Sequence, residues 1–146
     1  MLKIGIENDH LIARVSGYQA LGMVYFSLGQ FDKARFNPES ALDTKGREIP
    51  GINCYPSVSK DYLSYVLFIT GDADAARKMC DDAYLSALKE SDYSTASALS
   101  NGSVTQMILG NIDIVRGNPA DLIVLAEEKG QHMYINRGLL FNNLSQ

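Results

Sequence analysis

The chain repeats one seven-residue pattern three times, and this repeat constrains its fold more than any other feature. The pattern reads Gly, a polar residue, any residue, Asp, any residue, Ala or Val, and Arg, and it occupies 29–35, 71–77 and 110–116. Successive glycines are 42 and 39 residues apart, which is the length of two helices with their connections. The spacing therefore predicts a row of helix pairs.

Each copy of the pattern has the composition of a tight turn between two helices. Gly readily adopts the left-handed backbone that ends a helix. The next residue, Asp72 or Asn111, suits the N-cap of the following helix, and Gln30 is a weaker cap. The first turn after each cap holds an aspartate: Asp32, Asp74 and Asp113. Because the positive end of a helix favours carboxylates, we expect these aspartates to stabilise helix starts rather than to bind metal.

The flanking segments have helical spacing. Apolar residues recur every three or four positions from Leu11 to Leu28 and from Ala76 to Leu88. No stretch alternates convincingly enough to predict a strand. We therefore expect one all-α domain over 1–146, with three antiparallel helix pairs and a final helix that covers the exposed end. The expected ranges are 10–45, 57–91 and 93–129 for the pairs and 132–143 for the final helix.

Two of the predicted helices contain a proline. Asn37-Pro38 and Asn118-Pro119 follow the turn glycines at nearly the same distance in the first and third copies. Proline inside a helix removes a backbone hydrogen bond and costs about 3 kcal/mol, whereas Asn followed by Pro is a plausible helix start. The sequence therefore predicts a break or a kink at both positions.

Composition excludes several classes of protein. The formal net charge is −4 and Lys and Arg are scattered, so no basic surface for nucleic acid is expected. No apolar run reaches the roughly 20 residues of a membrane helix, and the N-terminus lacks the apolar core of a signal peptide. Two cysteines, Cys54 and Cys80, are too few for a disulfide framework or a zinc site. We expect a cytoplasmic protein that does not bind membranes.

No arrangement of residues indicates catalysis. His10 follows Asp9, but the pair precedes a predicted helix and is expected to cap it rather than to perform acid–base chemistry. Cys80 lies on the apolar face of a helix and is expected to fill the core. No metal-ligand cluster or phosphate-binding loop is evident. We expect a non-enzymatic protein without metal or cofactor.

The first helix pair resembles the tetratricopeptide repeat. The matching positions are Tyr18, Leu21, Gly22, Tyr25, Leu28, Gly29, Phe31 and Ala34. A small residue at the close helix contact persists as Gly22, Ser64 and Ser103. The resemblance covers about 11–129 and weakens along the chain.

These repeats are longer than usual for that family. In this they are similar to the repeat regions of bacterial multidomain signalling proteins of the ATPase and adenylyl cyclase type. The chain has no nucleotide-binding loop, so a catalytic label from such relatives would not apply to it. The opening Met1 and a closing helix favour a complete gene product over a piece of a longer one.

The resemblance implies that the first helix of each pair lines an inner groove. The candidate groove residues are Gln19, Met23, Phe26, Asp61, Tyr65, Phe68, Val104 and Met107. An apolar groove rich in Met and aromatic residues suits a peptide or an amphipathic helix of a partner protein. Three alternatives stay open: the final helix fills the groove, a second copy of the chain covers it in a homodimer, or the repeats close on a small molecule that they sense.

Overall fold

The computed structural model describes residues 1–44, 56–108, 110 and 112–144, and within these ranges it contains helices and no strand. The all-α prediction is confirmed. The helices are α1 (Leu2–Glu7), α2 (Leu11–Ser27), α3 (Phe31–Asp43), α4 (Pro56–Ile69), α5 (Ala73–Glu90), α6 (Asp92–Ile108), α7 (Ile112–Glu128) and α8 (His132–Leu144). The short helix α1 was not predicted, and Cys54 lies outside the described residues.

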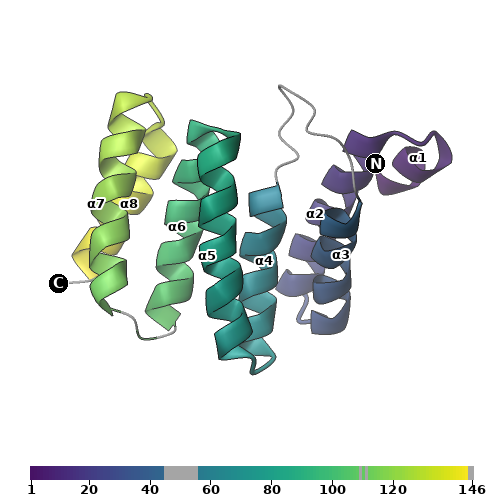
Figure 1. Cartoon of the computed structure of the whole chain (residues 1–146), viewed down its shortest axis with the longest axis horizontal. Coiled ribbons are helices and arrows are strands. Elements are labelled where there is room, and N and C mark those ends of the chain that lie inside the picture. The colour runs from purple at the N-terminus through teal and green to yellow at the C-terminus, as the bar shows by residue number, and fades with distance from the viewer. Residues whose placement is uncertain (45–55, 109, 111, 145–146) are drawn as a thin grey trace.

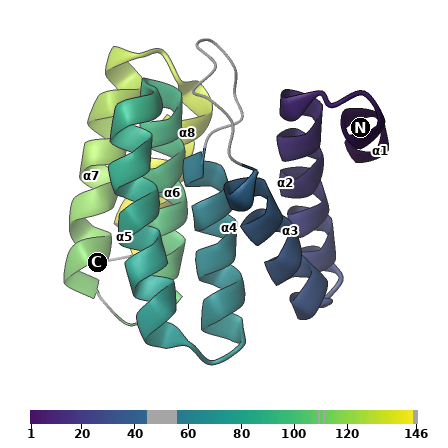
Figure 2. The ribbon, with the colours of Figure 1, turned by 45° about the vertical axis from the view of Figure 1, so that its right-hand side comes forward.

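The helices form two layers (Figure 1). In the first-helix layer, α2, α4, α6 and α8 stand in a row in which each helix contacts the next. The second-helix layer consists of α3, α5 and α7, each packed between two helices of the first layer. Within the described ranges these three helices do not contact one another. Figure 2 shows α1 against α2 at one end of the row.

The predicted turn glycines end their helices as expected. Gly29, Gly71 and Gly110 have positive φ angles between 68° and 94°, and Gly130, which follows α7, has a φ of 65°. Gly71 shows the pattern of bonds: its N–H donates to Phe68 O at 3.0 Å, and the next N–H, of Asp72, donates to Leu67 O at 2.9 Å. These two bonds satisfy carbonyls that the helix end would otherwise leave unpaired. An L-residue with a side chain would strain this backbone, so the repeated glycine is dictated by the turn.

The predicted helix starts are borne out where the structure describes them. Asp72 caps α5 through Oδ1, which accepts from the Ala75 N–H at 3.1 Å, and Gln30 makes no such bond at the start of α3. Asp32 and Asp74 lie in the first turns of α3 and α5. Asn111 and the side chain of Asp113 lie outside the described part of the chain.

The helix break that the sequence predicted at both prolines does not occur. α3 runs through Pro38 and α7 runs through Pro119. At the first site, Asn37 Nδ2 donates to Lys33 O at 2.7 Å and occupies a carbonyl of the preceding turn. Pro38 is buried, and Gly22 of α2 faces it so closely that a Cβ at Gly22 would lie 3.0 Å from Pro38 Cδ. Packing of the proline ring against α2 offsets the lost backbone hydrogen bond.

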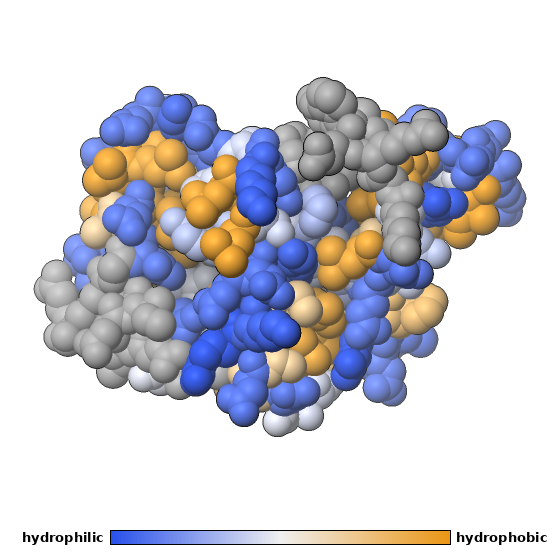
Figure 3. All heavy atoms as spheres, in the orientation of Figure 1, coloured by the Kyte–Doolittle hydropathy of each residue, from blue (hydrophilic) through white to orange (hydrophobic). Residues whose placement is uncertain are grey.

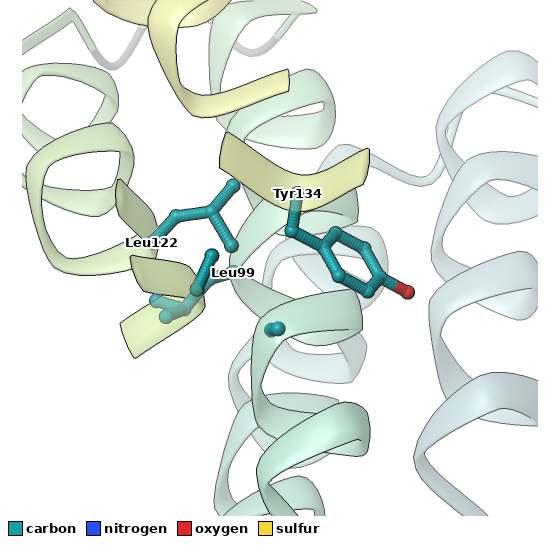
Figure 4. Close-up of a cluster of buried hydrophobic side chains, with 5 residues drawn as sticks. Leu99, Leu122 and Tyr134 are labelled. Atoms are coloured by element: carbon teal, nitrogen blue, oxygen red, sulfur yellow. The ribbon is translucent and has the colours of Figure 1, made fainter. Parts of the chain in front are cut away.

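Small side chains occupy many of the most deeply buried positions between helices. The residues with no more than 1% of their surface exposed include Ala34, Ala76, Ala83, Ala87, Ala96, Ala126, Ser57, Ser59, Ser64, Ser94, Ser100 and Ser103. Such residues let helix backbones approach closely. Larger side chains form two clusters: one around Leu63 and Leu67 of α4, and one at the C-terminal end where Leu99, Leu122 and Tyr134 from α6, α7 and α8 meet (Figure 4).

The surface of the second-helix layer is mixed. Figure 3 shows separate apolar areas over this face, divided by polar side chains. Leu85, Leu88 and Val124 are each more than half exposed on α5 and α7. No helix in the described ranges is long and apolar enough to cross a membrane.

The glycine contacts generate a test of the packing between α7 and α8. A Cβ added at Gly138 would lie 2.6 Å from Ile123 Cγ1 and 3.2 Å from Pro119 O. Gly138→Ala should therefore force α8 away from α7 and lower the free energy of unfolding by about 1–3 kcal/mol. Chemical denaturation followed by far-UV circular dichroism measures this.

The matched control is Gly102→Ala in α6. A Cβ there meets Cys80 Sγ at 3.5 Å and Asn118 Nδ2 at 3.7 Å, which are ordinary contacts. Because Ala is a better helix former than Gly, this variant should be unchanged or more stable by up to about 1 kcal/mol. Equal effects of the two substitutions would contradict the close approach of α8 to α7.

Candidate functional site

A pocket of about 390 Å³ opens on the first-helix layer. All four helices of that layer contribute to it. Its lining residues are Phe26 from α2, Tyr62, Tyr65, Phe68 and Ile69 from α4, Asn101, Val104 and Thr105 from α6, and Arg137 from α8. The volume lies within the range of sites that bind small ligands or a few side chains of a partner.

Helical spacing places the aromatic walls. Tyr62, Tyr65 and Ile69 follow one another at intervals of three and four residues on α4, so they share one face of that helix. The ring centroids of Tyr62 and Tyr65 are 6.2 Å apart and those of Phe26 and Tyr65 are 6.1 Å apart. These distances are within the range of favourable aromatic contacts. The rings therefore form a contiguous wall across α2 and α4.

A polar network lies beside the pocket and joins α4 to α6. Asn101 Nδ2 donates to Asp61 Oδ2 at 3.1 Å, and the Tyr65 hydroxyl donates to the backbone oxygen of Asn101 at 2.9 Å. The hydroxyls of Ser64 and Thr105 lie 3.4 Å apart in the same contact. Hydrogen bonds between neighbouring first-layer helices therefore fix how Tyr65 and Asn101 stand in the pocket wall.

Asp61 is the residue of this network with an unusual carboxyl pKa. The side chain is 2% exposed, and burial raises the pKa of Asp61 from 3.8 to about 7. The hydrogen bond from Asn101 favours the ionised form and opposes this rise, whereas the negative charge of Glu90 adds to it. A substantial fraction of Asp61 is therefore protonated at neutral pH.

Burial also keeps two neighbouring groups neutral. It raises the pKa of the Cys80 thiol to about 12, with a smaller contribution from Asp61. It raises the pKa of Tyr65 above its usual range, again with Asp61 adding to the effect. Cys80 is 6% exposed and fills the core as the sequence predicted, and a thiol held in this protonated form is a poor nucleophile.

The pocket brings together four of the eight candidate groove residues: Phe26, Tyr65, Phe68 and Val104. The other four are elsewhere. Gln19 and Asp61 are buried in helix contacts, where Gln19 Nε2 donates to Ser59 Oγ at 3.0 Å. Met23 and Met107 are about two-fifths exposed and do not line this pocket.

The eight candidates do not include the other five lining residues: Tyr62, Ile69, Asn101, Thr105 and Arg137. Tyr62 could have been found from its spacing of three to Tyr65 on a helical face. Arg137 was missed because the final helix was expected to cover the end of the row. In the structure α8 packs against both α7 and α6 at that end, so it also continues the first-helix layer, and Arg137 reaches the pocket from it.

The residues considered for acid–base or metal chemistry lie apart from the pocket. His10 is the N-cap of α2, where its Nδ1 accepts from the Ala13 N–H at 3.3 Å, so the capping prediction is confirmed. Asp9 beside it is exposed. In the described ranges no three His, Cys, Asp or Glu side chains are grouped as metal ligands would be.

No model of a known protein family matches the chain, and no curated protein matches it. We therefore infer the function from the pocket and its surroundings.

The titration of Asp61 predicts how stability depends on pH. Between about pH 4 and pH 7 the native state holds a proton that the unfolded chain has released, so stability falls as pH rises through this range. Asp61→Asn removes the ionisation. We expect this variant to be more stable than the parent chain by a few kcal/mol at pH 8, because each pKa unit corresponds to about 1.4 kcal/mol.

The advantage of Asp61→Asn should shrink towards pH 4. Chemical denaturation at a series of pH values measures it. Asp81→Asn, which removes an exposed carboxylate from α5, is the control for the loss of one negative charge. A stability gap that stays constant from pH 4 to pH 8 would contradict the buried, proton-binding state of Asp61.

Proposed function

We propose that the chain is a tetratricopeptide-like interaction module that binds an apolar segment of a partner protein, either a peptide or an amphipathic helix, in the pocket of the first-helix layer. The observation that supports this most strongly is the wall of four aromatic side chains, Phe26, Tyr62, Tyr65 and Phe68. Large apolar anchors of a partner fit such walls, and anchors of this kind dominate the energy of peptide recognition.

The position of α8 supports an open binding site over a self-filled one. The sequence left open that the final helix fills the groove. Its residues Tyr134, Gly138 and Phe141 are buried, and Tyr134 and Gly138 face α6 and α7. Of α8, only Arg137 lines the pocket among the described residues. A helix that extends the layer in this way leaves the space between the aromatic rings for another molecule.

Binding rather than catalysis is the role that we assign to the pocket. Asp61, the carboxyl group with the strongly raised pKa, is not a lining residue and bonds to Asn101 instead. The Tyr65 hydroxyl is occupied by the Asn101 backbone. The compartment that we propose is the cytoplasm, in keeping with the low cysteine content of the chain.

A small-molecule sensor is the second candidate function. The size of the pocket favours it, because about 390 Å³ is enough for a compact ligand. The aromatic side chains would stack on such a ligand. In this case the pocket would be occupied by a free molecule and no partner segment would compete for it.

The double variant Phe26→Ala with Phe68→Ala tests the interaction module. The probe is a displayed library of helical peptides with a randomised apolar face, selected on the full chain. We expect the double variant to bind the selected peptides at least about 30-fold more weakly, since loss of central aromatic contacts costs 2 kcal/mol or more. Fluorescence polarisation with a labelled peptide measures the affinity.

Phe36→Ala is the matched control, because Phe36 is 62% exposed on α3 in the other layer. It should leave peptide affinity unchanged. Light scattering of the parent and both variants shows whether a second copy of the chain is the occupant. Unchanged peptide affinity in a folded double variant would contradict the assignment of the pocket as the peptide-binding site.

A thermal-shift screen with metabolite-sized compounds tests the sensor. A compound that binds the native pocket raises the unfolding temperature in proportion to its affinity. We expect the shift to disappear in the same double variant. A screen in which no compound stabilises the chain would count against the sensor and in favour of the interaction module.

A further inference from the structure

Among the described residues that line the pocket, Arg137 is the one with a charged side chain. The other lining residues are aromatic, aliphatic or neutral and polar. Arg137 is half-buried on α8, and it lies close enough to Tyr62 and Tyr65 to lower the pKa of both hydroxyls against the stronger effect of burial. The pocket therefore has an apolar body and a single positive edge.

The positive charge of Arg137 is not matched within the described ranges. No carboxylate there forms an ion pair with it. The buried Asp61 bonds to Asn101, and its charge is further reduced by protonation near neutral pH. A guanidinium offers five N–H donors and pairs best with a carboxylate.

The neutral polar groups of the pocket are largely committed elsewhere. Asn101 Nδ2 donates to Asp61, and the Tyr65 and Thr105 hydroxyls both donate to the Asn101 backbone oxygen, at 2.9 and 3.3 Å. Tyr62 is held in an edge contact with Tyr65, and its hydroxyl makes no hydrogen bond among the described residues. Donors that are open to a bound molecule therefore concentrate at Arg137 and Tyr62, which makes the site selective for an acceptor.

We infer that the pocket binds a protein segment that carries an acidic side chain beside its apolar anchors, with the anchors between the aromatic rings and the carboxylate on Arg137. This rests on the proposed function and adds the charge of the partner to it. Charge complementarity favours Asp or Glu in the bound segment. The amide of Asn or Gln forms a weaker hydrogen bond with the guanidinium, and the ammonium of Lys repels it.

The test uses peptides selected on the full chain from helices with two large apolar residues four apart and one neighbouring position that varies among Glu, Gln and Lys. On the parent chain, Glu should be enriched and should bind about tenfold more tightly than Gln at the same position. With Arg137→Glu the order should reverse, so that Lys binds most tightly. With Arg137→Gln the preference for Glu over Gln should disappear.

Arg77→Glu is the matched control, because Arg77 is exposed on α5 in the second-helix layer. It changes the net charge equally and should retain the preference for Glu. Thermal unfolding verifies that each variant folds. If Arg137→Glu does not fold, Arg137→Gln alone tests the contribution of the positive charge.

The outcomes separate this inference from the proposed function. Peptides that bind without a preference for Glu, or a preference that survives in Arg137→Gln, would overturn the charge assignment and leave the interaction module standing. Failure of the parent chain to select any peptide would overturn both. A competition experiment compares 3-phenylpropanoate with the unlabelled peptide as displacers of the labelled peptide. If 3-phenylpropanoate displaces it at the lower concentration, the occupant is a small acid, and the assignment to a protein segment is overturned.

Discussion

Close approach of helix backbones is the constraint on which the rest of the structure depends. Alanine, serine and glycine occupy many of the contact positions, so α4 and α6 can each pack against four other helices. The contact between Gly22 and Pro38 shows the consequence, because an ordinary side chain at Gly22 would press on the proline ring. A fold of this kind is held by many short contacts between neighbours rather than by one large apolar centre.

The pocket lies where the contacts between helices change from apolar to polar. Where α4 faces α6, a hydrogen bond between the buried Asp61 and the half-buried Asn101 replaces apolar contacts and holds the two helices in register. The large aromatic rings lie beside this polar contact, and the Tyr65 hydroxyl donates a hydrogen bond to α6. The same network that connects the helices therefore positions the residues available to a ligand.

The sequence was most informative where local chemistry decides the structure. Glycine repeats located the turns, and Asp72 and His10 were recognised as caps because capping involves residues close in sequence. Pro38 was misjudged because its cost is local but its compensation, the contact with Gly22, comes from another helix. Arg137 was missed for a related reason: its role depends on where α8 packs, and no pattern within 132–144 states that.

The two layers differ in how they are connected, and this has a mechanical consequence. First-layer helices touch one another, whereas α3, α5 and α7 are joined only through that layer in the described part of the chain. Any bending of the row therefore pivots about the first-helix layer and opens or closes gaps between the second helices. Phe26 and Arg137 come from α2 and α8, at opposite ends of that layer. A change in the curvature of the row therefore changes the distance between them and with it the width of the pocket.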